Sequence, residues 1–458
     1  MKRFLKPLSL SGKNMKTKVF VVSLGCSKNH CDLENMMGIL VNNGYEITLD
    51  EFEADAVIVN TCGFIEAAKA EAIDNILEMA ELKETAKLKA LIVTGCLSQR
   101  YKDEILESFP EVDAVVGVFD FDKIHNVIDE VMEGKRILLT ESEALQCFNE
   151  MPRIQTTPFY TAYLKIAEGC DNRCTYCAIP YIRGKFVSRE MESLIKEAKE
   201  LVGSGVKELI IIAQDTTRYG IDLYGEPRLK ELLSRLSEIE GLEWIRLHYM
   251  YPEMITEELV EFIKNSDKVL NYFDIPIQHI NTRILKLMGR RSSREDIERV
   301  ISLIKNKIPD ATIRTTVIAG FPTETEEEFT ELCDFIKETA FDRLGAFAFS
   351  KEEGTPAYKL KGQLPKKIKE ARAEKIGALQ SAIMNENNKK HIGKTIEVLV
   401  EGLHNEYDVY FGRSRMDSVE IDGTVMFEAD EVIAFGDIVR VEITEASEYD
   451  LVGVYKKG

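Results

Sequence analysis

Hydrophobic residues in the first third of the chain form short continuous runs with little polar alternation. Such runs have the length of strands that are covered by helices on both faces. The expected strands are Lys18–Cys26, Ala56–Cys62, Ala90–Cys96 and Val112–Gly117, and the expected helices are 33–42, 65–82 and 121–132. Because strands and helices alternate, the pattern predicts a doubly wound α/β domain over residues 16–135.

A second strand–helix alternation follows residues 136–158, which contain two prolines, lack periodicity and are expected to be a linker. Helical patterns such as 189–203 and 294–306 separate its apolar runs. The expected strands are Ala162–Glu168, Glu208–Gln214, Trp244–Tyr249, Tyr272–Pro276, Thr312–Ala319 and Leu344–Phe349. Six such repeats predict a partial TIM-like (β/α)6 barrel over residues 159–388, with functional groups at the carboxyl ends of its strands.

The end of the chain changes character. Residues 365–390 form a long charged helical pattern, and short strands with glycine-containing turns follow it. This pattern predicts a small β-barrel over residues 389–458. At the other end, residues 1–15 are expected to be a disordered extension.

Charge and cysteine content narrow the function classes. The formal net charge is −19, and residues 389–458 carry 8 Lys/Arg against 15 Asp/Glu. Such acidity repels phosphate backbones, which argues against a nucleic-acid substrate and for a basic protein partner. The alternative explanation of the acidity is that it only keeps the protein soluble. Nine cysteines in a long chain without a signal sequence or membrane span indicate a reducing, cytoplasmic location.

The strongest chemical motif is Glu168-Gly-Cys-Asp-Asn-Arg-Cys-Thr-Tyr-Cys-Ala-Ile-Pro180. Its three thiolates, Cys170, Cys174 and Cys177, can hold three irons of a cubane cluster and leave one iron open to a small molecule. A structural zinc site is the alternative, but such a site normally uses four ligands, and no fourth Cys or His lies nearby.

Three further cysteines occur where predicted parallel strands end. Cys26, Cys62 and Cys96 each follow an apolar run and a Gly or Thr, which suggests exposed positions at one edge of the sheet. This topology predicts a second three-cysteine cluster site. Buried core cysteines are the alternative interpretation.

With these motifs, the chain resembles the methylthiotransferase family of radical S-adenosylmethionine (SAM) enzymes from about residue 16 to its end. The stretches that carry the resemblance include Ser23-Leu-Gly-Cys-Ser-Lys-Asn29, Asn60-Thr-Cys-Gly-Phe-Ile65, the cysteine motif, His248-Tyr-Met-Tyr-Pro252 and Asp274-Ile-Pro-Ile-Gln-His279. They are most similar to the branch that modifies small ribosomal subunit protein 12. A transfer-RNA branch with the same chemistry is the alternative, and its last domain tends to be basic.

The resemblance implies a radical SAM barrel between a cluster-binding first domain and a C-terminal TRAM domain. It implies two 4Fe-4S clusters and SAM as cofactors, and addition of a methylthio group to the β-carbon of an aspartate. It also implies an electron donor such as a flavodoxin or ferredoxin. A monomer is expected, as is no membrane partner. A non-catalytic iron–sulfur redox protein would not explain the SAM-type cysteine loop.

The resemblance also implies roles for residues around SAM. Tyr176 is expected near the adenine, although a core tyrosine would fit equally well. Ile318 and Gly320 resemble an adenine-contacting strand, where a glycine permits close backbone approach. Gln214 and Asp215 end a strand at the correct rim and could bind SAM or substrate, while Asp215 could instead cap a helix.

Other polar residues keep open interpretations. The basic run Arg183, Lys185 and Arg189 is expected to be a solvated helix face, or else to contact a phosphate or carboxylate. His248 and His279 receive no catalytic role, because a lone histidine is more often structural. The sequence assigns no role to Cys31, Cys147 or Cys333.

Overall fold

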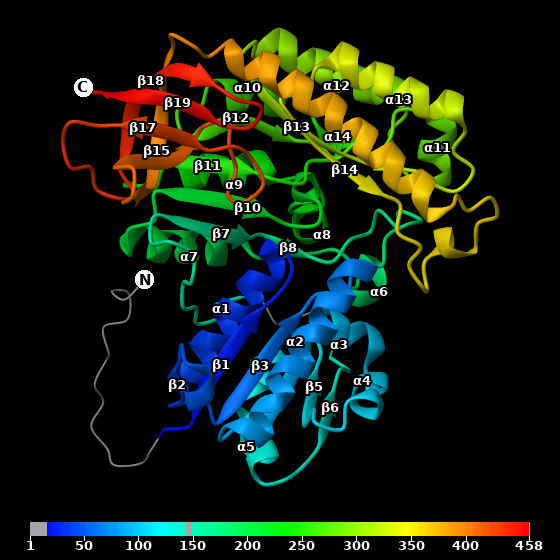
Figure 1. Ribbon diagram of the computed structural model, residues 1–458, viewed down its shortest axis with the longest axis vertical. Helices are drawn as coiled ribbons and strands as arrows, with labels where there is room; N and C mark the ends of the chain where they lie inside the picture. Colours follow the sequence, from blue (N-terminus) through cyan, green and yellow to red (C-terminus); the bar gives the residue numbers. More distant parts are fainter. Residues whose placement is uncertain (1–15, 143–148, 458) are drawn as a thin grey trace.

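The computed structural model describes residues 16–142 and 149–457, which form three domains (Figure 1). The first domain lies at the bottom of this view, the second domain lies above it, and the third packs beside the second at the upper left. Residues 1–15, expected to be an extension, and Cys147 lie outside the described residues.

The first domain is built on a parallel six-stranded sheet with the order β2-β1-β3-β4-β5-β6. Its strands are β1 (Lys18–Ser23), β2 (Glu46–Ile47), β3 (Ala56–Thr61), β4 (Ala90–Gly95), β5 (Ala114–Val116) and β6 (Ile137–Leu139). Its helices are α1 (Ser27–Asn42), α2 (Glu66–Thr85), α3 (Cys96–Tyr101), α4 (Asp103–Ser108) and α5 (Ile124–Met132), with 3-10 turns at Glu51–Glu53 and Phe121–Lys123. This topology confirms the doubly wound prediction. Strand order reverses between β1 and β3, which is where such sheets bind ligands.

Two boundaries of the first domain differ from the expectation. Strand β6 pairs with β5 and completes the sheet, although its residues fall inside the predicted linker. Helix α1 begins at Ser27, whereas the sequence predicted a start at residue 33. The prediction missed the first turns because the side chains that they bury are polar and include Lys28, Asn29 and Asp32. A pattern based on apolar spacing does not register a helix end whose contacts are polar.

The second domain is an open parallel sheet with the order β14-β13-β12-β11-β10-β7, as expected for a partial (β/α)6 barrel. The strands are β7 (Thr161–Lys165), β10 (Glu208–Ile212), β11 (Trp244–Leu247), β12 (Val269–Asp274), β13 (Thr312–Ala319) and β14 (Arg343–Ala348). The helices are α6 (Ile179–Ile182), α7 (Met191–Gly203), α8 (Ile221–Tyr224), α9 (Leu229–Ser237), α10 (Glu257–Lys264), α11 (Thr282–Leu287), α12 (Arg294–Lys307), α13 (Glu326–Thr339) and α14 (Lys366–Lys389). Shorter 3-10 turns span Thr216–Arg218, Pro252–Met254 and Pro356–Lys359.

Alternate residues of these strands face two different environments. On β10, Leu209 and Ile211 pack into the large core beneath the helices, while Ile210 and Ile212 face the concave side of the sheet. There they meet Cys31 of the first domain and Val419 of the third. The concave side is therefore covered by residues from both neighbouring domains.

The third domain is the predicted small barrel, closed in the order β15-β16-β17-β19-β18. Its strands are β15 (Thr395–His404), β16 (Val409–Ser414), β17 (Val425–Glu428), β18 (Ile438–Ala446) and β19 (Leu451–Lys456). Antiparallel pairing dominates, and only β17 and β19 pair in parallel within this barrel.

Residues 413–422 of the third domain contact the concave face of the second through polar contacts. Arg413 pairs with Glu208, and Asp417 pairs with Arg343 at 2.6 Å. Ser418 Oγ lies 2.8 Å from Nε2 of His248, whose Nδ1 faces Asp274. His248 therefore has the structural role that was expected, and the structure shows that this role is to join two domains.

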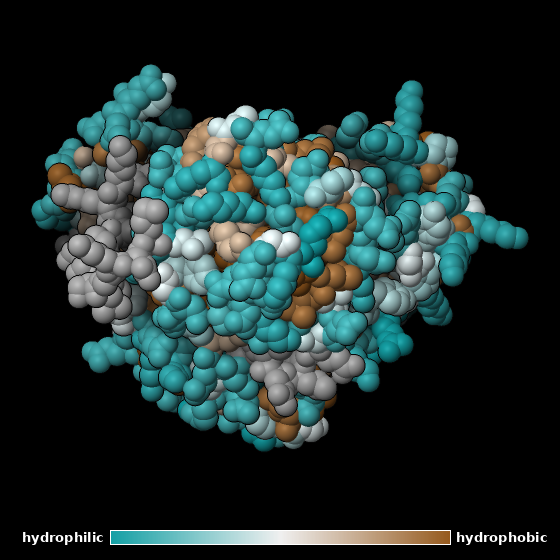
Figure 2. Space-filling model, turned by 90° about the horizontal axis from the view of Figure 1, so that it is seen from below, coloured by the Kyte–Doolittle hydropathy of each residue, from teal (hydrophilic) through white to brown (hydrophobic). Residues whose placement is uncertain are grey.

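The surface seen from the first-domain end is mostly hydrophilic, with separated hydrophobic patches (Figure 2). No helix among the described residues is long and apolar enough to cross a membrane.

Candidate functional site

The first cysteine trio lies at the carboxyl edge of the first sheet. Cys26 directly precedes α1, Cys62 follows β3, and Cys96 opens α3. A Cβ atom at Gly25, where φ is +98°, would lie 2.9 Å from Cys62 Cβ, so the loops of Cys26 and Cys62 touch. A Cβ at Gly95 would lie 2.4 Å from the Thr61 carbonyl oxygen. The glycines before two of these cysteines allow the three loops to meet.

Burial differs among the three thiols. Cys26 is exposed and Cys62 is half-buried, but Cys96 is only 4% exposed. The exposed position expected for all three is therefore wrong for Cys96, because α3 begins at this residue and Arg183 covers it. Burial raises the pKa of the Cys96 thiol to about 12; Arg183 acts in the opposite direction, and the nearby Cys26 and Cys62 raise it further.

The second trio lies on a loop held between two short strands, β8 (Ala167–Glu168) and β9 (Val187–Ser188), which pair with each other. Gly169, with φ +69°, begins this loop, and a Cβ there would lie 1.9 Å from the Lys185 carbonyl oxygen. The amide of Cys170 donates to the Gly184 carbonyl at 3.1 Å. Backbone contacts therefore fix the loop before any ligand is considered.

The donor atoms fit iron–sulfur chemistry. Burial raises the pKa of Cys170 to about 11, and Cys174 raises it further, which reflects how close the thiols lie. Binding metal would deprotonate them, because thiolates are the ligands. Three soft sulfur donors on a fixed loop suit a cluster with one open iron. Across residues 16–142 and 149–457, no three His, Cys, Asp or Glu side chains gather as ligands of a single metal ion.

One buried guanidinium joins the two trios. Nε of Arg183 donates to Cys96 Sγ at 3.4 Å, and Nη1 donates to Glu168 at 2.7 Å. Its Nη2 donates to Asp32 at 2.9 Å and to Asn29. The next residue, Gly184, accepts the amide hydrogen bond of Cys170. Arg183 therefore contacts one trio with its side chain and is linked to the other through the backbone.

Charge balance around Arg183 is nearly complete. Lys165 pairs with both Asp32 and Glu168. Although burial alone would raise the pKa of the Glu168 carboxyl, Arg183 and Lys165 lower it to about 2. Arg189 is also buried and pairs with Glu197. The solvated face expected for the basic run is thus wrong for Arg183 and Arg189, whose partners are carboxylates of this chain; only Lys185 is exposed.

The residues expected to bind SAM lie on the same rim, and several bind the cysteine loop. Asp215 is buried and accepts a hydrogen bond from Asn172 of that loop at 2.8 Å, but its side chain makes no capping bond. Gln214 Nε2 donates to Glu168 at 2.8 Å, and its buried Oε1 has no protein partner among the described residues. Tyr176 is half-buried against an apolar cluster that includes Phe321 and Ala357.

Ile318 lies near the end of β13 and packs against this cluster, and Gly320 directly follows the strand. Gly320 has φ +75°, and a Cβ there would lie 2.9 Å from Lys369 Cα. The close approach that requires glycine is therefore made by α14. The amides of Gly320 and Phe321 donate to Oε2 of Glu324, which fixes the turn after Ile318.

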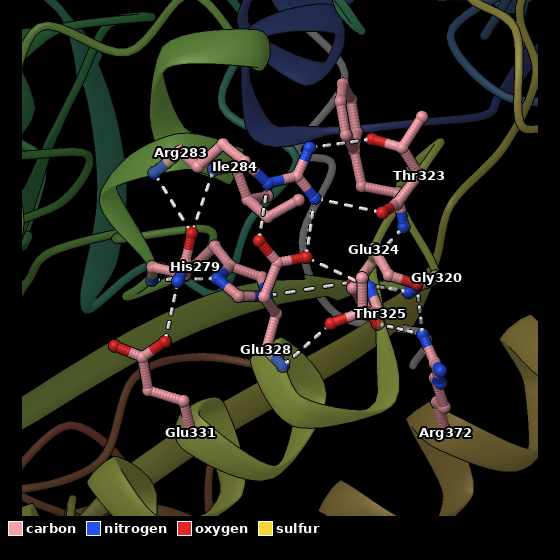
Figure 3. A network of polar contacts seen from close by, with 12 residues as sticks. His279, Arg283, Ile284, Gly320, Thr323, Glu324, Thr325, Glu328, Glu331 and Arg372 are labelled. Carbon is pink, nitrogen blue, oxygen red and sulfur yellow. Dashed lines mark hydrogen bonds and ion pairs between the residues drawn. The ribbon is translucent and has the colours of Figure 1, made fainter.

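A network of charged side chains supports this turn (Figure 3). Arg372 of α14 pairs with Glu324 at 2.6 Å, and Arg283 of α11 contacts Glu328 and the Thr323 carbonyl. His279 lies inside the network, 3.7 Å from Glu324, and is fully buried. The sequence analysis missed Arg372, because a single charged residue in a long charged helix shows no distinctive spacing.

Comparison with known proteins shows the family of the chain. Family models match for the uncharacterized protein family UPF0004 at residues 18–117, the radical SAM superfamily at 164–336 and the TRAM domain at 392–455. Ribosomal protein uS12 methylthiotransferase RimO of Clostridioides difficile is 53% identical over 438 residues, covering 95% of this chain and 98% of that protein. The chain belongs to the RimO family. RimO of Acetivibrio thermocellus is 50% identical, with 96% and 98% covered.

Membership in the RimO family confirms that the chain is a radical SAM methylthiotransferase, and that SAM and iron–sulfur chemistry serve it. Two structures of the radical SAM methyltransferase TsrM from Kitasatospora setae share the fold, with TM-scores of 0.55 and 0.56 at 15% identity. Each covers 75% of this chain, and 75% and 77% of the respective TsrM chains are matched.

Replacing Arg183 tests the link between the trios. Arg183→Met should leave Asp32 and Glu168 buried without their full complement of donors, and lower the free energy of unfolding by about 3–5 kcal/mol. Urea unfolding of the metal-free protein, followed by fluorescence of Trp244, the single tryptophan, measures the change. Arg294→Met is the matched control, because Arg294 pairs with Glu298 and Glu331 at the surface and should cost about 1 kcal/mol or less. Equal effects of the two changes would contradict the prediction.

His279 should make stability depend on pH. Burial lowers its pKa from 6.5 to about 4; Glu328 raises it, while Arg283 and Arg372 lower it further. The unfolded chain therefore binds a proton that the folded chain does not, and stability is lost as pH falls from about 6.5 to 4. Between pH 7 and 4 the wild type should lose about 3 kcal/mol more than His279→Asn, which keeps an acceptor for the Asn281 amide. Parallel pH profiles in urea unfolding would refute this.

Proposed function

We propose that this enzyme adds a methylthio group to the β-carbon of an aspartate of ribosomal protein uS12. The full-length likeness to enzymes named for uS12 supports the substrate. The observation that carries the chemistry is the pair of thiol trios, Cys26/Cys62/Cys96 and Cys170/Cys174/Cys177, on facing rims joined by Arg183. Each trio would hold one 4Fe-4S cluster.

The bound clusters and SAM supply sulfur and the one-electron chemistry needed to break an unactivated C–H bond. The chain contributes position. Gly169, Gly25 and Gly95 let the thiol-bearing loops approach closely, and Arg183 holds the rims together. Tyr176 and the apolar residues around it exclude water beside the cysteine loop of the second domain. The buried Oε1 of Gln214 has no hydrogen-bond partner among the described residues, which suggests that a polar ligand binds at this rim.

Charge supports a basic protein as the substrate. Acidic residues of the TRAM domain lie largely on its surface, namely Glu406, Asp408, Glu420, Glu428, Asp430, Glu431, Asp437, Glu445 and Glu448. Opposite charge accelerates encounter and favours the correct partner. Ribosomal proteins and reduced thiols are found in the cytosol, so we infer that the enzyme works there. We also infer that it works as a monomer.

Product mass decides the substrate. The reconstituted, reduced enzyme receives SAM and sulfide, with either a uS12 peptide or transfer RNA. We expect a methylthio group in place of hydrogen on the peptide aspartate and no change in the RNA, because the TRAM surface is acidic. A gain on RNA alone would refute the substrate and leave the chemistry standing.

Iron content decides the number of clusters. After anaerobic reconstitution the wild type should hold about eight irons per chain, and each triple Cys→Ala variant of one trio about four. Cys333→Ala, which changes a buried cysteine outside both trios, should keep the full content. A triple variant that retained all the iron would exclude its trio as ligands.

A further inference from the structure

A group of lysines gathers beside the cysteine loop on the surface of this acidic protein. Residues 351–369 contain six lysines and two acidic residues. We call this group the lysine surface: Lys351, Lys359, Lys361, Lys366, Lys367 and Lys369. It follows β14 and runs into the start of α14, at the right-hand edge of Figure 1. All but Lys369 are exposed.

The positive charge of this surface is largely uncompensated. Within the described residues, Lys359, Lys361 and Lys367 have no ion pair, and the one pair that involves the surface joins Lys366 to Glu370 at 3.6 Å. Glu352 points away from it. Its carboxylate is 2% exposed and is matched by Arg100 and Lys69 of the first domain. In a protein of net charge −19, this is a local reversal of sign.

The lysine surface directly adjoins the cysteine loop. The amide of Ala357 donates to the carbonyl of Thr175, between Cys174 and Cys177, at 2.8 Å. Ala357 and Tyr176 share one apolar cluster. Next to Ala357, Tyr358 is 37% exposed, and Ile368 on α14 is 41% exposed. A partner here would find an apolar anchor within a basic rim.

We propose that the lysine surface docks an acidic protein that carries a low-potential one-electron group. The inference rests on the proposed function, because it takes Cys170, Cys174 and Cys177 as cluster ligands. Charge argues for this occupant: an acidic carrier is repelled by the protein as a whole and attracted only where the sign reverses, so it arrives oriented toward the cluster.

The electron balance is simple. A flavodoxin hydroquinone would be oxidised by one electron to its semiquinone, and a cluster held by Cys170, Cys174 and Cys177 would be reduced by that electron. Bound SAM would be the final acceptor of this electron, and its reductive cleavage to methionine would supply the radical chemistry of the enzyme. No further oxidant or reductant is needed.

A charge-reversal variant tests the surface. Lys359, Lys361 and Lys367 are changed together to Glu, and an acidic flavodoxin is the probe. Binding of oxidised flavodoxin to the metal-free protein should weaken roughly tenfold or more, and the wild-type affinity should fall as salt rises. In the reconstituted enzyme the KM for reduced flavodoxin should rise with little change in kcat, while SAM cleavage driven by dithionite stays at the wild-type rate.

A control variant with the same charge change carries Lys199→Glu, Lys264→Glu and Lys394→Glu, which are exposed, lie away from the cysteine loop and form no ion pair among the described residues. It should bind flavodoxin as the wild type does. Unchanged binding by the first variant, an equal loss in both, or a loss confined to RNA binding would overturn the proposal. If the wild type bound flavodoxin but cleaved no SAM even with dithionite, the proposed cluster role would fail, and the binding comparison would still decide the docking site.

Discussion

A buried cation must be neutralised where it lies, and in this enzyme that requirement joins two domains. Arg183 belongs to the second domain, yet Asp32, Asn29 and Cys96, which receive its hydrogen bonds, belong to the first. Because Glu168 and Lys165 complete the same network, neither domain satisfies its charges alone. The spacing of the two cysteine trios follows from this pairing.

The sequence predicted what depends on local pattern. Continuous apolar runs located the longer strands of both parallel sheets but not the short β2 and β6, and the strand ends placed six cysteines at two sheet edges. What failed involved partners distant in sequence. The start of α1 was missed because its polar residues are buried against the second domain, and Arg183 and Arg189 were placed in solvent because their carboxylates come from other segments. A single residue such as Cys96 also cannot reveal from its neighbours how deeply it will be buried.

Exposed positive and negative charges lie on different faces of the molecule. The TRAM barrel exposes carboxylates, the second domain exposes lysines beside the cysteine loop, and the interior pairs nearly every buried charge. Around Gly320 the same principle acts on the backbone. Glu324 accepts two amide hydrogen bonds and is itself held by Arg372, so α14 supports a turn that apolar packing alone would not fix.

The way the concave side of the barrel is covered affects how the protein folds during its synthesis. Ile210 and Tyr163 are covered on one side by the first domain and on the other by Val419. A ribosome delivers the barrel strands well before residues 413–422. Until then the second domain presents an open apolar face, Arg343 lacks its partner Asp417, and Glu208 is paired with Arg246 but not with Arg413. The catalytic domain is therefore finished only by the last part of the chain, and a truncated product would carry Cys170, Cys174 and Cys177 on an incompletely folded barrel.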